Sequence, residues 1–286
     1  MRNARVLPFA LACVAALAQA PAPGTAAGTL KVNGAAIPLA KAYAHLHDNA
    51  EAVLDTPKEL RILLADKAQP EGALGGLNLP FTVADRVKDG AVRGLMIRMD
   101  PANLNAAVIT LLYPPAHEGQ SLVNQTVSNS GKPALKKLVI HEDRVDGEIV
   151  AEAEEHEDPD FPSASYAIRF SAPLTREPAV TATLKGKAAL DSPQVQMLRL
   201  KARALAKGDL KGVGQYMTED SFRRQNAEMA QAGPEVLAMV KQQGAEMEKS
   251  LKDIARIVVR GDHASAIWKD KNWISLVKVG EAWKTE

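Results

Sequence analysis

The sequence predicts two domains: an all-β antiparallel sandwich over residues 29–187, followed by a small α+β domain over residues 191–286. Three observations lead to this fold class. Short runs of alternating apolar and polar residues, separated by turn residues, fill the first range. Apolar residues then recur at helical spacing between capping residues. The chain ends in short extended runs again, which predicts helices packed on a curved antiparallel sheet.

The first residues are typical of a secretory signal peptide. Arg2 and Arg5 give a positive start, and residues 6–18 are largely apolar. That run is shorter than the roughly 20 residues that a membrane-spanning helix needs. Cleavage after residue 18 fits best, so residues 1–18 are predicted to be the signal peptide, with Ala20 and Ala27 as alternative sites. The mature protein is therefore expected to be exported, to the bacterial periplasm or outside the cell.

Cys13 is the only cysteine, and it lies within the predicted leader. Cleavage after Ala18 leaves a mature chain of about 268 residues without a thiol, which excludes disulfides and thiolate metal sites. An exported chain without cysteine suits an oxidising compartment such as the periplasm. Lipidation of Cys13 is the alternative, although the preceding Ala10-Leu11-Ala12 fits a lipid-attachment motif poorly.

The charge balance argues against nucleic acid as a partner. The net charge of +1 becomes −1 when Arg2 and Arg5 are removed with the leader. Because the chain has no large basic field, nucleic-acid binding has no electrostatic support, and an aromatic content of 4% leaves few residues on which bases could stack. No later stretch is long and apolar enough to cross a bilayer, so no transmembrane segment is expected in the mature chain.

The elements of the first domain follow a lead-in at residues 19–28, predicted to be flexible because it is rich in Pro, Ala and Gly. Turn residues such as Gly75-Gly76 and Pro114-Pro115 separate the strands. A short helix is predicted over residues 81–89, with Gly90 past its end. The predicted strands are residues 29–33, 39–47, 60–64, 92–99, 106–113, 135–141, 148–154 and 165–170.

A change of composition near Leu190 marks the predicted boundary between the domains. Ser192 can cap a helix whose first residue is Pro193, and Lys207-Gly208 supplies its stop signal. Asp209 can cap a second helix that runs through Tyr216. A third helix is expected to begin near Asp220 and to break or restart at Gly233-Pro234.

A further helix and a sheet complete the second domain. An apolar stripe predicts a helix that covers a sheet; its members are Leu237, Val240, Gly244, Met247 and Leu251. Strands are predicted at residues 254–260, 263–269, 273–279 and 282–284. Gly261-Asp262, Asp270-Lys271 and Gly280-Glu281 are the expected turns between them.

The order of these elements, together with a few short motifs, resembles that of a known protein family. Its motifs are Lys207-Gly208-Asp209, Tyr216-Met217, the strand and turn from Val258 to Ala264, and Gly280-Glu281-Ala282-Trp283-Lys284. The last third of the chain thereby resembles the nuclear-transport-factor-2-like superfamily, the cone-shaped α+β fold shared by SnoaL-type cyclases and ketosteroid isomerase. The amino-terminal part resembles β-sandwich domains of exported bacterial proteins.

The resemblance implies a pocket for small apolar ligands between the helices and the curved sheet. Enzymes of the superfamily place acids, tyrosines or histidines inside that pocket. No residue of this chain matches those catalytic positions one by one, and the nearby candidates have plainer interpretations. Glu219 and Asp220 suit a helix start, Tyr216 suits packing at a helix end, and His263 follows a turn. No catalytic residue is therefore assigned.

Two sets of residues are candidates for binding. The tryptophans Trp268, Trp273 and Trp283 all lie in the last sheet, where large rings fill a core or form a pocket wall. Together with Tyr216 they are the predicted ligand-binding residues. His45 and His47 lie on one face of a strand and could bind zinc or copper if a third ligand came from His117, His141 or His156.

The function that follows is binding rather than catalysis. The chain has no nucleophile elbow, phosphate-binding loop or Rossmann glycine motif, and no cofactor is predicted. The leading hypothesis is an exported, periplasmic binding or interaction protein that holds a small apolar molecule or docks an envelope protein. One alternative is an isomerase, dehydratase or hydrolase that uses the cone pocket. The other is a structural component of an envelope assembly.

Overall fold

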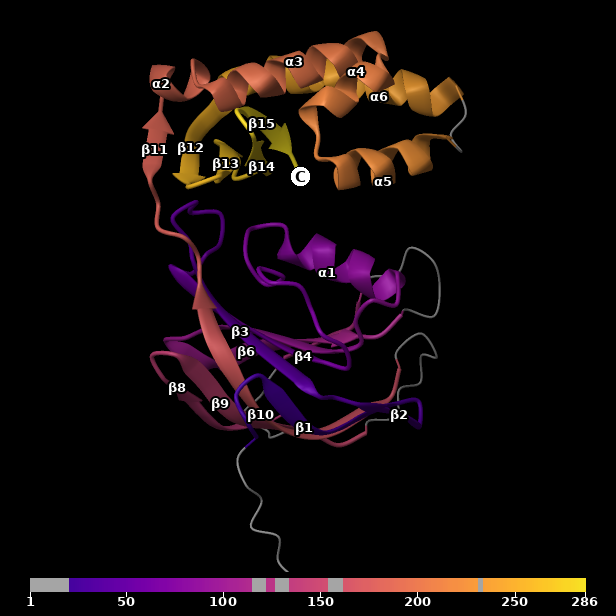
Figure 1. The fold of residues 1–286 in the computed structure, drawn as a ribbon, viewed down its shortest axis with the longest axis vertical. Helices are drawn as coiled ribbons and strands as arrows, with labels where there is room; N and C mark the ends of the chain where they lie inside the picture. Colours follow the sequence, from indigo (N-terminus) through magenta and orange to yellow (C-terminus); the bar gives the residue numbers. More distant parts are fainter. Residues whose placement is uncertain (1–20, 115–121, 127–133, 154–161, 231–233) are drawn as a thin grey trace, which may run out of the picture.

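The computed structural model describes residues 21–114, 122–126, 134–153, 162–230 and 234–286. Within these ranges the chain is mostly antiparallel β-structure in two sheets, accompanied by a few helices (Figure 1). The prediction of a β-rich chain with helices near its carboxyl end is confirmed at this level. The predicted signal peptide, with Cys13, Ala18 and Ala20, lies outside the described residues.

The first sheet contains ten strands in the order β7-β6-β5-β4-β3-β1-β10-β9-β8, with β2 paired to β1. The strands are β1 (Thr25–Val32), β2 (Ala35–Pro38), β3 (Lys41–Asp48), β4 (Lys58–Ala65), β5 (Gly94–Asp100), β6 (Asn103–Leu112), β7 (Asn124–Thr126), β8 (Ala134–Ile140), β9 (Arg144–Ala151) and β10 (Ala164–Arg176). They are joined in one continuous path, so the two facing sheets of a sandwich remain a prediction.

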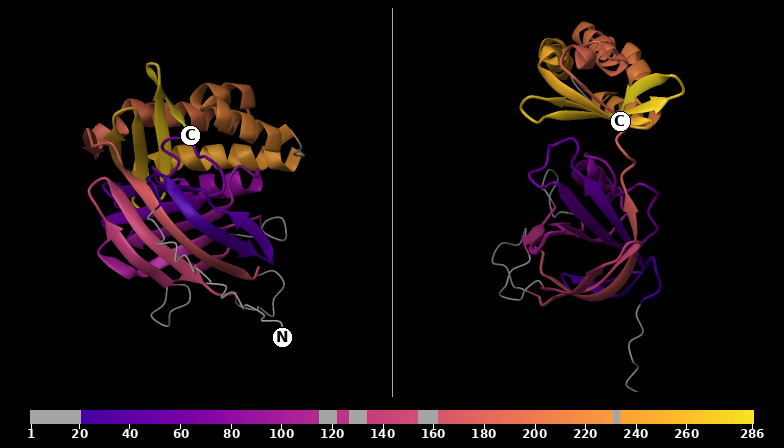
Figure 2. Two further views of the ribbon diagram at one scale, coloured as in Figure 1. Left: turned by 60° about the horizontal axis from the view of Figure 1, so that its bottom comes forward. Right: turned by 90° about the vertical axis from the view of Figure 1, so that its left-hand side faces the viewer.

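The sheet curls because β10 is long and pairs with three other strands. Along most of its length β10 pairs antiparallel with β1 and β9. At its carboxyl end it pairs in parallel with β3, where Leu174 lies opposite Ala44. The sheet therefore bends into the open half-barrel seen in Figure 2. Apolar side chains inside the curl, among them Leu30, Ile62, Ile97 and Phe170, form the main core.

Helix α1 (Leu79–Lys88) covers the other face of the curled sheet. Its buried Leu79, Val83 and Val87 pack with Leu63 and Met96 of the sheet. The predicted helix at residues 81–89 is confirmed with a start two residues earlier. Gly90 follows it with a φ of 66°, a conformation that glycine adopts without a steric penalty.

Two predicted boundaries differ from the structure. The lead-in at residues 19–28 is strand from Thr25 onward, because this segment pairs with β10 from Ser171 to Ile168. The composition of this segment predicts flexibility. The structure gives Gly28 a different role, because its backbone passes so close to Ala167 O that a side chain would not fit. The alternative cleavage site at Ala27 would thus cut inside β1. In addition, β11 (Ala182–Lys185) falls in the range assigned to the sandwich but pairs with β12 of the second sheet.

The second sheet has five antiparallel strands in the order β11-β12-β13-β14-β15. Its remaining strands are β12 (Ile254–Arg260), β13 (His263–Trp268), β14 (Trp273–Val279) and β15 (Ala282–Thr285). The helical segments are α2 (Lys187–Leu190), α3 (Pro193–Lys207), α4 (Leu210–Val213), η1 (Gly214–Tyr216), α5 (Glu219–Ala230), α6 (Pro234–Ser250) and η2 (Leu251–Asp253). The helix α3 packs on one face of the sheet through Val195 and Leu198.

The helix-capping predictions are confirmed. The Ser192 side chain accepts a hydrogen bond from Val195 N at 3.3 Å, and Pro193 is the first residue of α3. Gly208 ends α3 in the left-handed conformation with a φ of 73°. The Asp209 carboxylate accepts from Gly212 N at 2.8 Å and caps the short α4. The third predicted helix is α5, which begins at Glu219.

Helix α6 packs chiefly on α3, so the predicted stripe faces a helix more than a sheet. Val240 and Leu251 are buried as expected, whereas Leu237 is 36% exposed. At Gly244 the two helices approach so closely that an added Cβ would lie 2.7 Å from Leu205 Cβ and 2.8 Å from Ala202 O. Glycine is therefore required here by close backbone approach.

We expect Gly244→Val to lower the free energy of unfolding by about 2–3 kcal/mol, because α6 must move away from α3 to make room for the new side chain. Urea denaturation measures the loss. Ala238→Val, on the exposed side of the same helix, is the matched control and should cost under about 0.7 kcal/mol. Equal effects of the two substitutions would contradict the close contact.

Candidate functional site

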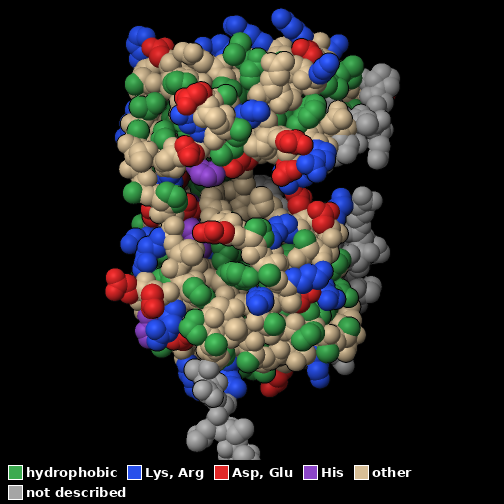
Figure 3. Space-filling view, in the orientation of Figure 1, with side chains coloured by type: hydrophobic (Ala, Val, Ile, Leu, Met, Phe, Trp, Pro, Cys, Tyr) green, Lys and Arg blue, Asp and Glu red, His purple; other side chains and the backbone are tan. Residues whose placement is uncertain are grey.

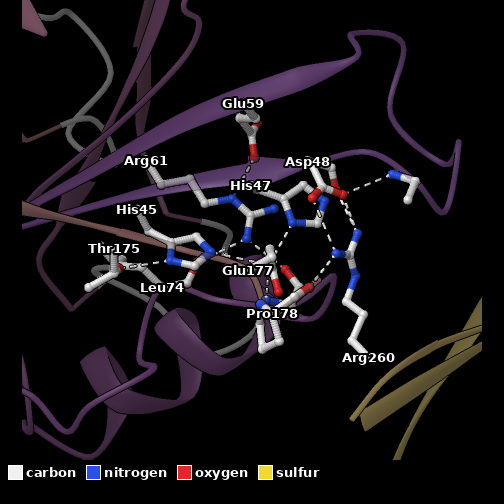
Figure 4. Close-up of polar contacts among 12 residues, drawn as sticks. His45, His47, Asp48, Glu59, Arg61, Leu74, Thr175, Glu177, Pro178 and Arg260 are labelled. Carbon is white, nitrogen blue, oxygen red and sulfur yellow. Dashed lines mark hydrogen bonds and ion pairs between the residues drawn. The ribbon is translucent and has the colours of Figure 1, made fainter. Parts of the chain in front are cut away.

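Among the described residues, a group of buried ionisable side chains lies where the chain leaves β10 for the second sheet (Figure 4). Its centre is Glu177, the residue after β10, whose side chain is 8% exposed. Glu177 Oε1 accepts hydrogen bonds from His47 Nδ1 at 2.7 Å, His45 Nε2 at 3.2 Å and Gly76 N at 2.8 Å. One carboxylate oxygen thus joins β3, the loop after β4 and the segment that leads to β11.

The environment of Glu177 favours its ionised form. Burial by itself would raise the pKa of Glu177, but the hydrogen bonds from His45, His47 and Gly76 N outweigh it. The pKa of this carboxyl is therefore held far below its usual range. A buried carboxylate with three donors is well satisfied, and removing it would leave those donors without their acceptor.

This depressed pKa predicts a pH dependence of stability. The unfolded chain has an ordinary glutamate pKa of about 4.3, so the stabilisation by ionised Glu177 is complete above that pH and is lost as the pH falls toward the lower folded-state pKa. We expect the difference in unfolding free energy between wild type and Glu177→Gln to be large at pH 7 and smaller at pH 3. Urea titrations at both pH values measure it, and an equal difference would contradict this linkage.

The two histidines lie on one face of β3, as the sequence predicts, and both are buried. His45 Nδ1 lies 2.9 Å from Thr175 Oγ1 on β10, while its Nε2 faces Glu177. His47 donates through Nδ1 to Glu177, and its buried Nε2 has no hydrogen-bond partner among the described residues. Three of the four ring nitrogens are thus engaged within the protein.

Among the described residues, the predicted metal site at His45 and His47 has no third ligand. In the part of the chain that the structure describes, no group of three His, Cys, Asp or Glu side chains could hold a metal ion. His141 lies elsewhere, 3.0 Å from Asp146. His117 and His156 fall outside the described residues.

Arg260, at the end of β12, connects the second sheet to this cluster. Its side chain is 5% exposed. Nε donates to Glu51 Oε1 at 3.0 Å, and Nη1 donates to Asp48 Oδ2 at 3.2 Å and to Pro178 O at 2.7 Å. Burial would lower the pKa of Arg260, but the two carboxylates outweigh it and keep the guanidinium charged. The five fixed donors of arginine suit such a set of acceptors.

A second buried arginine fixes the loop between β4 and α1. Arg61, 2% exposed, donates from Nε to Glu59 Oε2 at 2.7 Å. Its Nη1 donates to the carbonyl oxygens of Leu74 at 2.9 Å and Gly76 at 2.6 Å. The same Gly76 donates its N–H to Glu177, so Arg61 positions one of the three donors around that carboxylate.

Further contacts join the outer face of the second sheet to the first part of the chain. Trp273 Nε1 donates to Asn78 Oδ1, just before α1, at 3.0 Å. Arg256 donates to Glu51 O, and Lys271 forms an ion pair with Asp55 at 3.3 Å. We call the set of Asp48, Glu51, Glu177, His45, His47 and Arg260 the junction cluster. Its groups bind one another, which suits a structural joint between the sheets.

Three of the four predicted ligand-binding residues lie together on the helix-covered face of the second sheet, opposite its outer face. Trp268 is buried and donates Nε1 to Ser250 O at 2.9 Å. Tyr216 and Trp283 are half-buried and pack against the same core as Trp268. Trp273 is separate, because it pairs with Ile267 and not with Trp268. That one-residue offset turns its ring to the other face of the sheet.

The remaining candidates near this sheet face solvent. Glu219 and Asp220 are exposed in the first turn of α5, and Asp220 accepts a hydrogen bond from Arg223 at 2.8 Å. His263 is 59% exposed and lies 3.6 Å from Glu286. These positions agree with the interpretation of helix-start and turn residues.

Sequence reasoning missed Glu177, Arg260 and Lys201, a half-buried lysine on α3. Arg260 gave a weak signal. Strand alternation places it on the same face of β12 as Arg256 and Val258, so two arginines share a face with an apolar residue. Lys201 gave a stronger one, since it interrupts the apolar stripe between Leu198 and Leu205. Glu177, next to a proline between two strands, carried no signal.

The surface is hollowed between the part of the molecule that carries α5 and the part that carries α1 (Figure 3).

No protein-family model matches this chain, and the searches of curated proteins and of solved structures found no match. Among the described residues, no helix is both long and apolar enough to cross a membrane. The functional conclusion therefore rests on the geometry of the chain itself.

Proposed function

We propose that this chain is an exported binding protein whose second, helix-covered sheet holds a small apolar ligand. The observation that carries the proposal is the grouping of Tyr216, Trp268 and Trp283 at one core. Two of these rings are half-buried, so each offers an apolar surface together with a polar edge. Such rings at a protein surface are suited to grip a small apolar molecule.

The junction cluster favours binding over catalysis. General acid–base chemistry needs an ionisable group that can reach a substrate and exchange a proton with it. Glu177 and Arg260 are instead buried and occupied by protein partners. The role that fits them is to hold the curled sheet and the second sheet together, with the curled sheet available as an interaction surface for an envelope protein.

The family and the location belong to the same proposal. The order of α3, α4, α5 and α6 followed by the meander β12–β15 is the order expected of a nuclear-transport-factor-2-like cone. The ten-stranded sheet would then form a separate domain. The charged, apolar leader supports export to the periplasm, and a mature chain without cysteine is compatible with that compartment.

Tryptophan fluorescence with a panel of fatty acids and steroids tests the binding proposal. We expect at least one ligand to shift or quench the emission of the wild type and of Trp273→Phe, whose lost ring lies on the far face. The same ligand should have a smaller effect on Trp283→Phe. If no ligand in the panel changes the fluorescence or the melting temperature, the proposal fails.

A further inference from the structure

Lys201 is a basic residue on the apolar face of α3. It lies three residues after Leu198 and four residues before Leu205, both buried, and these spacings place all three side chains on one side of the helix. Lysines are almost never buried without a partner. A lysine at this position is therefore expected to have a partner that compensates its positive charge.

The partner that the protein supplies is neutral. Lys201 Nζ donates to Thr285 Oγ1 on β15 at 2.7 Å. The Thr285 hydroxyl in turn donates to Tyr216 O at 3.3 Å. Within the described residues no carboxylate lies within ion-pair distance of Lys201, and Thr285 is its one hydrogen-bond partner. An ammonium has three N–H donors, so two of them have no protein partner among the described residues.

Two apolar clusters lie before and after Lys201 along α3. Toward the start of α3 lies the core around Leu198, to which Tyr216 and Trp283 belong. Toward its end lies a second cluster that includes Leu205 and Met217. Met247 packs against both clusters, and Lys201 lies on α3 between Leu198 of the first cluster and Leu205 of the second. Thr285 and Trp283 project from the same face of β15, since they are two residues apart.

We propose that Lys201 is the anchor for the carboxylate of an amphiphilic ligand, a fatty-acid-like molecule whose apolar chain packs against Tyr216 and Trp283. A carboxylate has two oxygens that can accept the free N–H donors of the ammonium. Its charge compensates for the removal of that ammonium from water. This inference rests on the proposed function and adds the chemical class of the ligand.

The electrostatics of the site agree with this assignment. Burial lowers the pKa of Lys201 to about 8, because partial removal from water disfavours the charged ammonium. A group with a shifted pKa in a partly buried site is a candidate for function. A bound carboxylate supplies the missing negative charge.

Isothermal titration calorimetry at pH 7 with decanoate and with decanol, its neutral counterpart, tests the inference. We expect wild type to bind decanoate roughly ten-fold more tightly than decanol, as a charge-assisted hydrogen bond predicts. Lys201→Met should bring the two affinities to within about three-fold of each other, and Lys201→Arg should keep most of the preference. Lys207→Met, an exposed lysine of the same helix, is the control and should behave as wild type.

The outcomes separate this inference from the function on which it rests. Equal binding of decanoate and decanol to wild type overturns the carboxylate anchor and leaves the apolar site in place. Binding of neither ligand overturns both. Because the wild-type comparison needs no variant, the test stands even if Lys201→Met fails to fold, which circular dichroism would reveal. Retention of the preference in a folded Lys201→Met also overturns the inference.

Discussion

Replacing Arg260 with methionine is expected to lower the free energy of unfolding by about 3–5 kcal/mol, the usual cost of removing one partner of a buried ion pair. The guanidinium serves Glu51, Asp48 and Pro178 O at once. Glu51 is 3% exposed, so its carboxylate would remain buried without a counter-charge. Methionine fills a similar volume, so the loss reports the charge contacts and not a cavity.

Urea denaturation followed by two signals measures this effect. All three tryptophans lie in the second sheet, so their fluorescence follows that sheet, while far-ultraviolet circular dichroism follows the whole chain. In the Arg260→Met variant we expect the fluorescence transition to move to lower urea, ahead of the circular dichroism transition. Arg223→Met, an exposed arginine on α5, is the matched control and should change stability by under about 0.5 kcal/mol. A loss below about 1 kcal/mol for Arg260→Met would contradict the joint.

Replacing Glu177 with glutamine is expected to cost about 2–3 kcal/mol at pH 7. The amide keeps the shape of the carboxylate but has no charge. In the wild type, three donors bond to the charged oxygen. All three donors bond to Oε1, so the amide oxygen can take that place while the NH₂ group takes the place of Oε2. The expected loss therefore comes from weaker acceptance, because a neutral amide oxygen replaces a charged carboxylate oxygen as the acceptor of three buried donors.

The matched control for Glu177 is Glu142→Gln, an exposed carboxylate in the turn after β8. That substitution should change the unfolding free energy by under about 0.5 kcal/mol. Chemical denaturation of both variants in the same buffer gives the comparison. A Glu177→Gln protein as stable as the control would mean that the three hydrogen bonds to this carboxylate contribute nothing to the joint.

Local signals in the sequence predicted the helix ends well. Ser192 and Asp209 accept the capping hydrogen bonds expected of them, and Gly208 adopts the left-handed conformation of a helix stop. These features depend on residues within three or four positions of one another. The same holds for the turns of the last sheet, where Gly261 and Gly280 have positive φ values.

The junction cluster could not be predicted in this way, because its members are far apart in the sequence. His45 and His47 contact Glu177 because the end of β10 pairs in parallel with β3. No local sequence pattern predicts that pairing. The two histidines were recognised as neighbours on a strand, but their partner proved to be a carboxylate of the linking segment.

Register explains the division of the tryptophans. Trp268 and Trp273 lie on adjacent strands, and a pairing one residue different would have placed them on one face. The actual pairing of Ile267 with Trp273 separates them. The predicted ligand-binding set is thereby divided, with Trp273 at the contact to Asn78 and the others packed at one core under the helices.

Native mass spectrometry of the protein purified from the organism that makes it tests the central claim most directly, because it detects a retained ligand without a choice of candidates. We predict a species heavier than the bare chain by one small molecule that is released on denaturation and carries a carboxylic acid. Detection of the bare chain alone, under conditions gentle enough to preserve non-covalent complexes, would contradict the account of this chain as a binding protein.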